Sequence, residues 1–161
     1  MLQNGTEPKD PICRWRGHGL MLDLMPMEQD VLGFSNRWYI DGWKSAIPMA
    51  LPPELSIRIF RYPYFLTTKL EAFHDRGADD PRFSHDLEDI VLTLAARTDL
   101  PKDFEEIPPM LMAYLRNAIH GLMTKRRYRE YITCNLPMHV AKDAFERLDR
   151  FFAMIVRTMT D

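Results

Sequence analysis

Apolar and polar residues follow different patterns in the two parts of the chain. Up to residue 62, short apolar runs are separated by Gly, Pro, Asn and Asp, which is typical of strands and turns. From residue 63 onward, apolar residues recur every three or four positions, the period of amphipathic helices. Strands followed by helices predict an α+β fold. We expect the β-rich region 1–62 and the helical region 63–161 to form one compact domain.

The first part contains runs with strand character, at residues 12–16, 20–25, 47–51 and 56–61. The first two flank a Gly-rich connection and predict a β-hairpin. Because the second run is almost entirely apolar, we expect a central strand that is covered on both faces. Pro52-Pro53 predicts a turn between the last two runs. Ser35 is a candidate N-cap for a short helix that ends near residue 46.

Helical periodicity in the second part predicts helices at about 63–76, 85–97, 109–125, 128–136 and 138–159. Pro63 suits the first turn of the first helix, and Gly77 is placed to end it. Ser84 is a candidate N-cap for the second helix, because its side chain can accept a hydrogen bond from the first turn.

Composition narrows the function only slightly. The net charge of −2 gives no global basic field for nucleic acid. The two cysteines, Cys13 and Cys134, give neither a disulfide framework nor zinc spacing and fit a reducing compartment. The polar start lacks a signal peptide, and no run reaches the roughly 18 apolar residues of a membrane span. We therefore expect a cytoplasmic protein without a membrane partner.

Asp23 is unusual because it lies inside the apolar run 20–25. A buried carboxylate costs several kcal/mol unless it is paired or binds a cation. Two interpretations are open. Asp23 is a metal ligand or general base at a sheet edge, or it is a structural residue paired with Arg14 or Arg16 across the hairpin.

Lys69 and Arg76 lie seven residues apart on one face of the helix predicted at 63–76. This spacing corresponds to about 10 Å of helical rise, so two cations there could straddle a polyphosphate. A solvated basic face, or ion pairs with Glu71 or Asp75, explains the same pattern.

Asp86 and Asp89 share a face of the next predicted helix, three residues apart. They could orient Lys69, bind a metal or accept a proton. The simpler explanation is that acidic residues in a first turn complement the helix dipole.

Lys125-Arg126-Arg127 and the nearby Tyr128 and Tyr131 form a basic, aromatic segment. Such a segment could contact RNA by charge and stacking. A charged connection between two helices is the more common explanation.

Three ordered stretches give the chain a family resemblance. The first consists of residues 11–16 and 22–26, which contain Asp23, followed by the segment 32–39. The other two are residues 65–73 with Arg76-Gly77, which contain Lys69, and Ser84-His-Asp-Leu-Glu-Asp-Ile90. Together they resemble a family of bacterial nucleotidyltransferase-like proteins, the AbiEii/AbiGii toxin type of toxin–antitoxin systems. The resemblance covers roughly residues 11–98.

The resemblance implies a nucleotidyltransferase fold, with a small mixed sheet followed by a helical C-terminal half. It also implies Mg²⁺-dependent transfer of a nucleotide from a nucleoside triphosphate to an RNA or protein acceptor. Carried over by position, Asp23, Lys69 and Asp86 would be catalytic, and Asp23 would be a metal ligand. Lys69 would hold nucleotide phosphates, with Arg76 and Asp89 beside it.

The chain departs from the family pattern before Asp23. The family places a Gly-rich turn and an Asp-x-Asp pair upstream of this strand, and residues 1–22 contain no such pair. The pattern then implies a remnant, a start placed too late, or a domain completed by another chain. Because one carboxylate holds Mg²⁺ poorly, the alternative to a nucleotidyltransferase is an inactive interaction module that self-associates or binds a protein partner.

Overall fold

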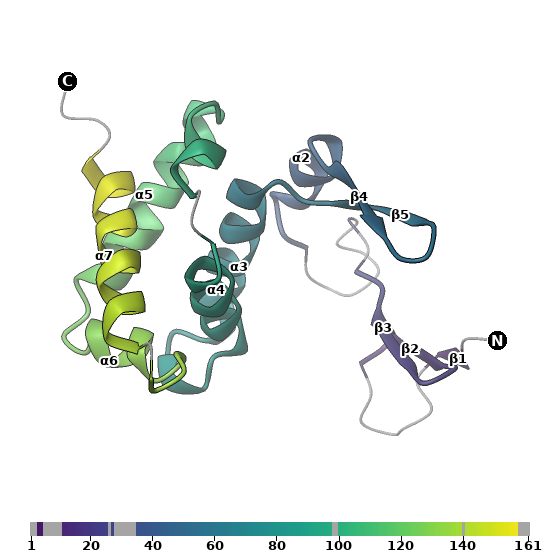
Figure 1. The fold of residues 1–161 in the computed structure, drawn as a ribbon, viewed down its shortest axis with the longest axis horizontal. Helices are drawn as coiled ribbons and strands as arrows, with labels where there is room; N and C mark the ends of the chain where they lie inside the picture. Colours follow the sequence, from purple (N-terminus) through teal and green to yellow (C-terminus); the bar gives the residue numbers. More distant parts are fainter. Residues whose placement is uncertain are drawn as a thin grey trace. The chain divides into compact units, whose positions relative to one another are not determined.

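The computed structural model describes residues 3–4, 11–25, 27, 35–97, 100–139 and 141–157 (Figure 1). The chain divides into two compact units, residues 1–40 and 41–161. The α+β class is confirmed, because the described residues form α-helices together with small antiparallel sheets. The mixed sheet that the family resemblance implies is not among the described strands, which pair only in antiparallel fashion.

The first unit contains a three-stranded antiparallel sheet with strands β1 (Gln3–Asn4), β2 (Arg14–Gly17) and β3 (Leu20–Asp23), in that order. The predicted hairpin is confirmed, since Arg14 pairs with Asp23 and Gly17 with Leu20. His18 and Gly19 form its tight turn with φ values of 51° and 76°. Positive φ at both central residues matches the twist of the flanking strands.

The prediction that 20–25 is a central strand covered on both faces is wrong. β3 is the last of the described strands in its sheet, and all four of its residues are exposed, with Leu20 at 69%. An apolar run shows that a strand can be buried, but only the tertiary structure supplies the layers that cover it.

The short helix α2 (Tyr39–Lys44) begins four residues after Ser35. Ser35 is therefore not its N-cap. Asn36 takes a related role at this turn, because its Oδ1 accepts a hydrogen bond of 3.1 Å from the Trp38 N–H. The next hairpin is confirmed and consists of β4 (Ile47–Leu51) and β5 (Leu55–Ile59).

The rest of the second unit is helical and includes two 3₁₀ helices, η1 and η2. The elements are α3 (Tyr62–Arg76), η1 (Pro81–Phe83), α4 (His85–Ala95), η2 (Leu100–Phe104), α5 (Pro109–Met123), α6 (Tyr128–Thr133) and α7 (Ala141–Arg157). Every helix predicted from the periodicity is present, with ends that differ by a few residues. Pro63 lies in the first turn of α3, and Gly77 follows its last residue, as predicted.

The core of the second unit lies between α3, α4, α5 and α7, which pack against one another (Figure 1). Its fully buried side chains come from the apolar stripes of these helices and include Leu66, Leu70, Phe73, Leu87, Ile90, Leu94, Leu115, Ile119, Leu148 and Phe152. Among the described helices, none combines the length and the apolar character needed to cross a membrane.

Candidate functional site

The packing of α3 against α4 brings together four of the residues singled out in the sequence. On α3, Leu66, Leu70 and Phe73 are fully buried, and Lys69 and Arg76 flank this buried stripe on the side that meets the start of α4. Ser84 fixes that start, because its Oγ accepts a hydrogen bond of 3.3 Å from the Leu87 N–H. Asp86 therefore lies in the first turn of α4, opposite the two cations.

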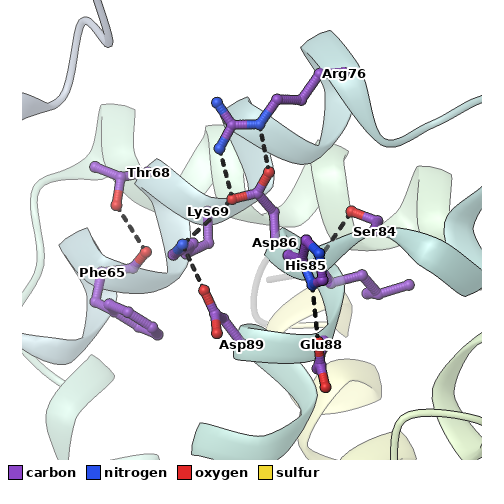
Figure 2. Close-up of polar contacts among 10 residues, drawn as sticks. Phe65, Thr68, Lys69, Arg76, Ser84, His85, Asp86, Glu88 and Asp89 are labelled. Carbon is purple, nitrogen blue, oxygen red and sulfur yellow. Dashed lines mark hydrogen bonds and ion pairs between the residues drawn. The ribbon is translucent and has the colours of Figure 1, made fainter. Parts of the chain in front are cut away.

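Asp86 accepts hydrogen bonds from both cations (Figure 2). The Arg76 guanidinium binds it in a bidentate manner, with Nε 2.8 Å from Oδ2 and the terminal nitrogen 2.9 Å from Oδ1. Lys69 Nζ lies 3.3 Å from Asp86 Oδ1 and 2.6 Å from Asp89 Oδ2. We refer to Lys69, Arg76, Asp86 and Asp89 as the α3–α4 ion-pair cluster.

Burial differs sharply within this cluster. The Asp86 side chain is 6% exposed, whereas those of Lys69 and Arg76 are 28% and 63% exposed. A carboxylate this deeply buried is tolerated because charged donors satisfy it. The cations are thus anchored from the inside by Asp86 while parts of both side chains remain open to solvent.

The carboxylates also keep Lys69 charged. Burial alone lowers the pKa of Lys69, but the hydrogen bond and charge of Asp89, together with Asp86, raise it above the ordinary lysine value. A lysine held in the ammonium form is suited to binding an anion.

A close approach between the end of α3 and the start of α4 sets this geometry. A Cβ added at Gly77 would lie 2.3 Å from Ser84 Oγ and 2.9 Å from Phe73 Cδ2. The absence of a side chain at Gly77 therefore lets the N-cap of α4 sit against the last turn of α3.

Asp23 lies in the first unit, and the structure pairs it with Arg14. The Arg14 guanidinium donates to both Asp23 oxygens at 2.8 Å across the hairpin. This is the structural pairing that the sequence left open beside metal binding.

The described residues do not fit a Mg²⁺ site at Asp23. Both of its oxygens accept from Arg14, and the described part of the chain has no group of three or more His, Cys, Asp or Glu side chains that could hold a metal ion. Mg²⁺ ordinarily needs several oxygen ligands in near-octahedral geometry.

A pocket of about 520 Å³ lies in the second unit, at the junction of the β4–β5 hairpin, α3 and α4. Aromatic and aliphatic side chains line most of it, with Thr93 and three charged residues, and the lining consists of Ile47, Ile59, Phe60, Arg61, Tyr62, Phe65, Thr93, Arg97 and Asp103. We call it the aromatic pocket. Arg97 lies 2.6 Å from Asp103 and stacks over the Tyr62 ring at 4.9 Å.

The basic segment at 125–131 is largely engaged in contacts within the protein. Arg127 forms an ion pair with Glu130, and Tyr128 is buried. The Arg129 guanidinium lies 4.5 Å from the centre of the Phe145 ring. These contacts match a charged connection between helices, and RNA binding by this segment stays a prediction.

The sequence singled out all four residues of the α3–α4 ion-pair cluster, but it did not predict the aromatic pocket. From the sequence, Asp86 and Asp89 were possible partners of Lys69, and Glu71 or Asp75 were alternative partners of the two cations. The pocket joins Tyr62, Arg97 and Asp103, which lie far apart in the sequence. The one local signal was aromatic enrichment, with Phe60, Tyr62 and Phe65 close together.

Comparisons with known proteins add no assignment, because no family model, curated protein or solved structure matches the chain.

Proposed function

We propose that the chain is a nucleotidyltransferase-like domain that binds the phosphates of a nucleoside triphosphate through Lys69 and Arg76. The observation that carries the proposal is Asp86, a buried carboxylate that holds both cations from behind. The order of the Lys69 and Asp86 segments, which resembles the AbiEii/AbiGii type, supports the same function.

The cluster is electrically balanced, with two cations and two carboxylates, so an anion must displace one acid. Asp89 is the acid that can move, because its side chain is 48% exposed and its contact with Lys69 is a single one. Exposed ion pairs contribute little to stability, typically 0 to about 1 kcal/mol. When Asp89 turns away, the remaining three groups carry a net positive charge, already oriented by Asp86 toward a phosphate.

Lys69 and Arg76 account for binding of the triphosphate, whereas transfer of the nucleotide needs further groups. Transfer implies Mg²⁺ beside the triphosphate, and Asp23 with Arg14 on both oxygens does not fit that metal. We therefore derive no chemical step from Asp23.

The test is calorimetric titration of the full chain with a nucleoside triphosphate, with and without Mg²⁺. We expect binding that Lys69→Ala weakens at least about tenfold, because a charge-assisted contact to phosphate contributes roughly 1.5–3 kcal/mol. Lys142→Ala is the matched control, since Lys142 is an exposed lysine on α7. Equal affinity of the native chain and Lys69→Ala, with unchanged helical content, would reject the proposal.

A second candidate function, an interaction module, is favoured by one observation on the β4–β5 hairpin. The side chains that share one face of this hairpin are all apolar, namely Ile47, Met49, Leu51, Leu55, Ile57 and Ile59. Four of them are 37–57% exposed, namely Ile47, Met49, Leu55 and Ile57. A contiguous exposed apolar face is typical of an interaction surface. Because this face carries no charged side chain, two copies can pack it against itself without burying a charge, and we propose a second copy of this chain as its occupant.

A further inference from the structure

The aromatic pocket and the α3–α4 ion-pair cluster lie along the same pair of helices. Phe65 lines the pocket and lies four residues before Lys69 on α3 (Figure 2), while Thr93 lines it four residues after Asp89 on α4. Positions four apart share a helix face and are separated by about 6 Å of rise. Because Lys69 contacts Asp89, the next turn on each helix places Phe65 and Thr93 next to this contact along the line where α3 meets α4.

The walls of the pocket suit a flat, unsaturated group. Phe60 and Phe65 are partly exposed and line the pocket, so part of each ring can contact a ligand. Tyr62 is buried against Phe65, with 5.7 Å between ring centres, and gives that ring a firm support. The volume of about 520 Å³ falls within the roughly 300–1,000 Å³ of small-molecule sites.

The pocket also offers hydrogen-bond donors and acceptors in fixed positions. Arg97 and Asp103 form an ion pair of 2.6 Å through the buried Oδ2 of Asp103, while about a third of each side chain stays exposed. The exposed part of Arg97 can donate to a ligand, and the exposed part of the Asp103 carboxylate can accept from it. Tyr62 contributes its ring and not its hydroxyl, because the hydroxyl oxygen is buried. Thr93 adds a hydroxyl to the same lining.

We propose that the aromatic pocket receives the nucleobase of a nucleoside triphosphate whose phosphates lie at Lys69 and Arg76. This inference rests on the proposed function and assigns a second part of the same ligand. The ligand runs from the aromatic pocket to the α3–α4 ion-pair cluster along the line where the two helices meet. Its base lies against Phe65, and its phosphates lie one turn or more farther along α3.

A nucleobase fits this pocket better than a purely apolar group. Its ring faces stack on phenylalanine, and its edge presents both donors and acceptors, which match Asp103 and Arg97. A purely apolar ligand would remove water from this charged pair without offering it a hydrogen bond, which costs free energy. The charge of the triphosphate has its own counterpart in the cluster, so each part of the ligand meets a complementary surface.

The experiment compares a nucleoside triphosphate with inorganic tripolyphosphate on the full chain, by calorimetry in one buffer, with all four common bases tested. We expect at least one nucleoside triphosphate to bind about tenfold or more tightly than tripolyphosphate. Phe65→Leu keeps an apolar side chain but removes the stacking face. We expect it to remove that advantage and leave tripolyphosphate affinity unchanged, since stacking on one aromatic ring contributes about 5- to 100-fold.

Phe83→Leu is the matched control, because Phe83 is 78% exposed and outside the pocket lining, and it should change neither affinity. Equal affinity of the native chain for tripolyphosphate and every nucleoside triphosphate would overturn the base pocket while the phosphate site stands. Parallel loss of both ligands in Phe65→Leu would also overturn it. Failure of both ligands to bind the native chain would reject the proposed function itself, together with this inference.

Discussion

Asp86 shows how one buried charge can organise a surface. Its carboxylate is almost fully removed from solvent and accepts three hydrogen bonds, two from Arg76 and one from Lys69. Removing a charge from water costs several kcal/mol, so a buried acid is retained only where its partners are fixed. The consequence for the site is that Arg76 is held by Asp86, whereas Lys69 is shared between the buried Asp86 at 3.3 Å and the half-exposed Asp89 at 2.6 Å.

This difference gives a residue-scale prediction. Asp86→Asn should lower the free energy of unfolding by about 1.5–3 kcal/mol, because it removes the charge that satisfies Arg76 and Lys69 in a buried position. The loss stays moderate because both cations can turn to solvent. Asp89→Asn should cost no more than about 1 kcal/mol, since that carboxylate is half exposed.

Urea unfolding followed by circular dichroism measures both changes. Equal effects of the two substitutions would contradict the dominant role of Asp86. The comparison is well matched, because the two residues lie three positions apart on the same helix and both contact Lys69.

At the scale of elements, the junction between α3 and α4 positions the cluster. Gly77 follows α3, and the Ser84 side chain that caps α4 packs where a Gly77 side chain would be. The sequence predicted both residues in these roles, Gly77 as a helix end and Ser84 as an N-cap. It did not predict that they touch, because the contact crosses the intervening η1 turn.

Gly77→Ala should therefore lower the free energy of unfolding by about 1–3 kcal/mol. The new methyl group would displace Ser84 Oγ, which would also weaken the hydrogen bond to the Leu87 N–H. Gly121→Ala is the control, because a Cβ at Gly121 in α5 has no atom within 4 Å. It should stabilise the protein by about 0.5–1 kcal/mol through better helix propensity. Thermal and urea unfolding measure whether each substitution lowers or raises the free energy of unfolding. A stabilising Gly77→Ala would contradict the close packing.

Helices and turns were predicted correctly where the signal in the sequence depends on a few neighbouring residues. Helices with a strong apolar stripe, such as α4 and α7, were predicted from periodicity alone. The short helix α2 was placed too early, because Ser35 and Asn36 are both acceptable N-terminal residues and only Asn36 makes the hydrogen bond to Trp38.

At the scale of the whole molecule, the exposed apolar face of the β4–β5 hairpin determines whether the chain is expected to self-associate. A two-stranded hairpin is marginally stable by itself, and one that exposes an apolar face gains from being covered. Ile47 and Ile59 at its end also line the aromatic pocket, so the face continues toward the candidate ligand site.

We expect the chain to form a dimer that dissociates when a charge is placed on this face. Met49→Lys introduces that charge at a position that is 42% exposed and should shift the particle to a monomer in light scattering. Ala50→Lys adds the same charge on the opposite face of the hairpin and should leave the dimer intact. A native chain that stays monomeric at high micromolar concentration would contradict self-association through this face.

The sequence by itself determined the α+β class, the order of the helices, the two hairpins and the residue types at the helix ends. These features depend on hydrophobic period, Pro, Gly and N-cap residues, whose effects act over a few neighbouring positions. The sequence also singled out Lys69, Arg76, Asp86 and Asp89, because charges at helical spacing share a face.

Only the tertiary structure decided which charges meet and which strands are covered. Arg76 pairs with Asp86 on the next helix, Asp23 pairs with Arg14, and β3 is exposed although its sequence is apolar. The aromatic pocket likewise needs β5, α3, α4 and η2 together. These outcomes depend on how separate elements pack, and their energies depend on burial, which no local pattern specifies.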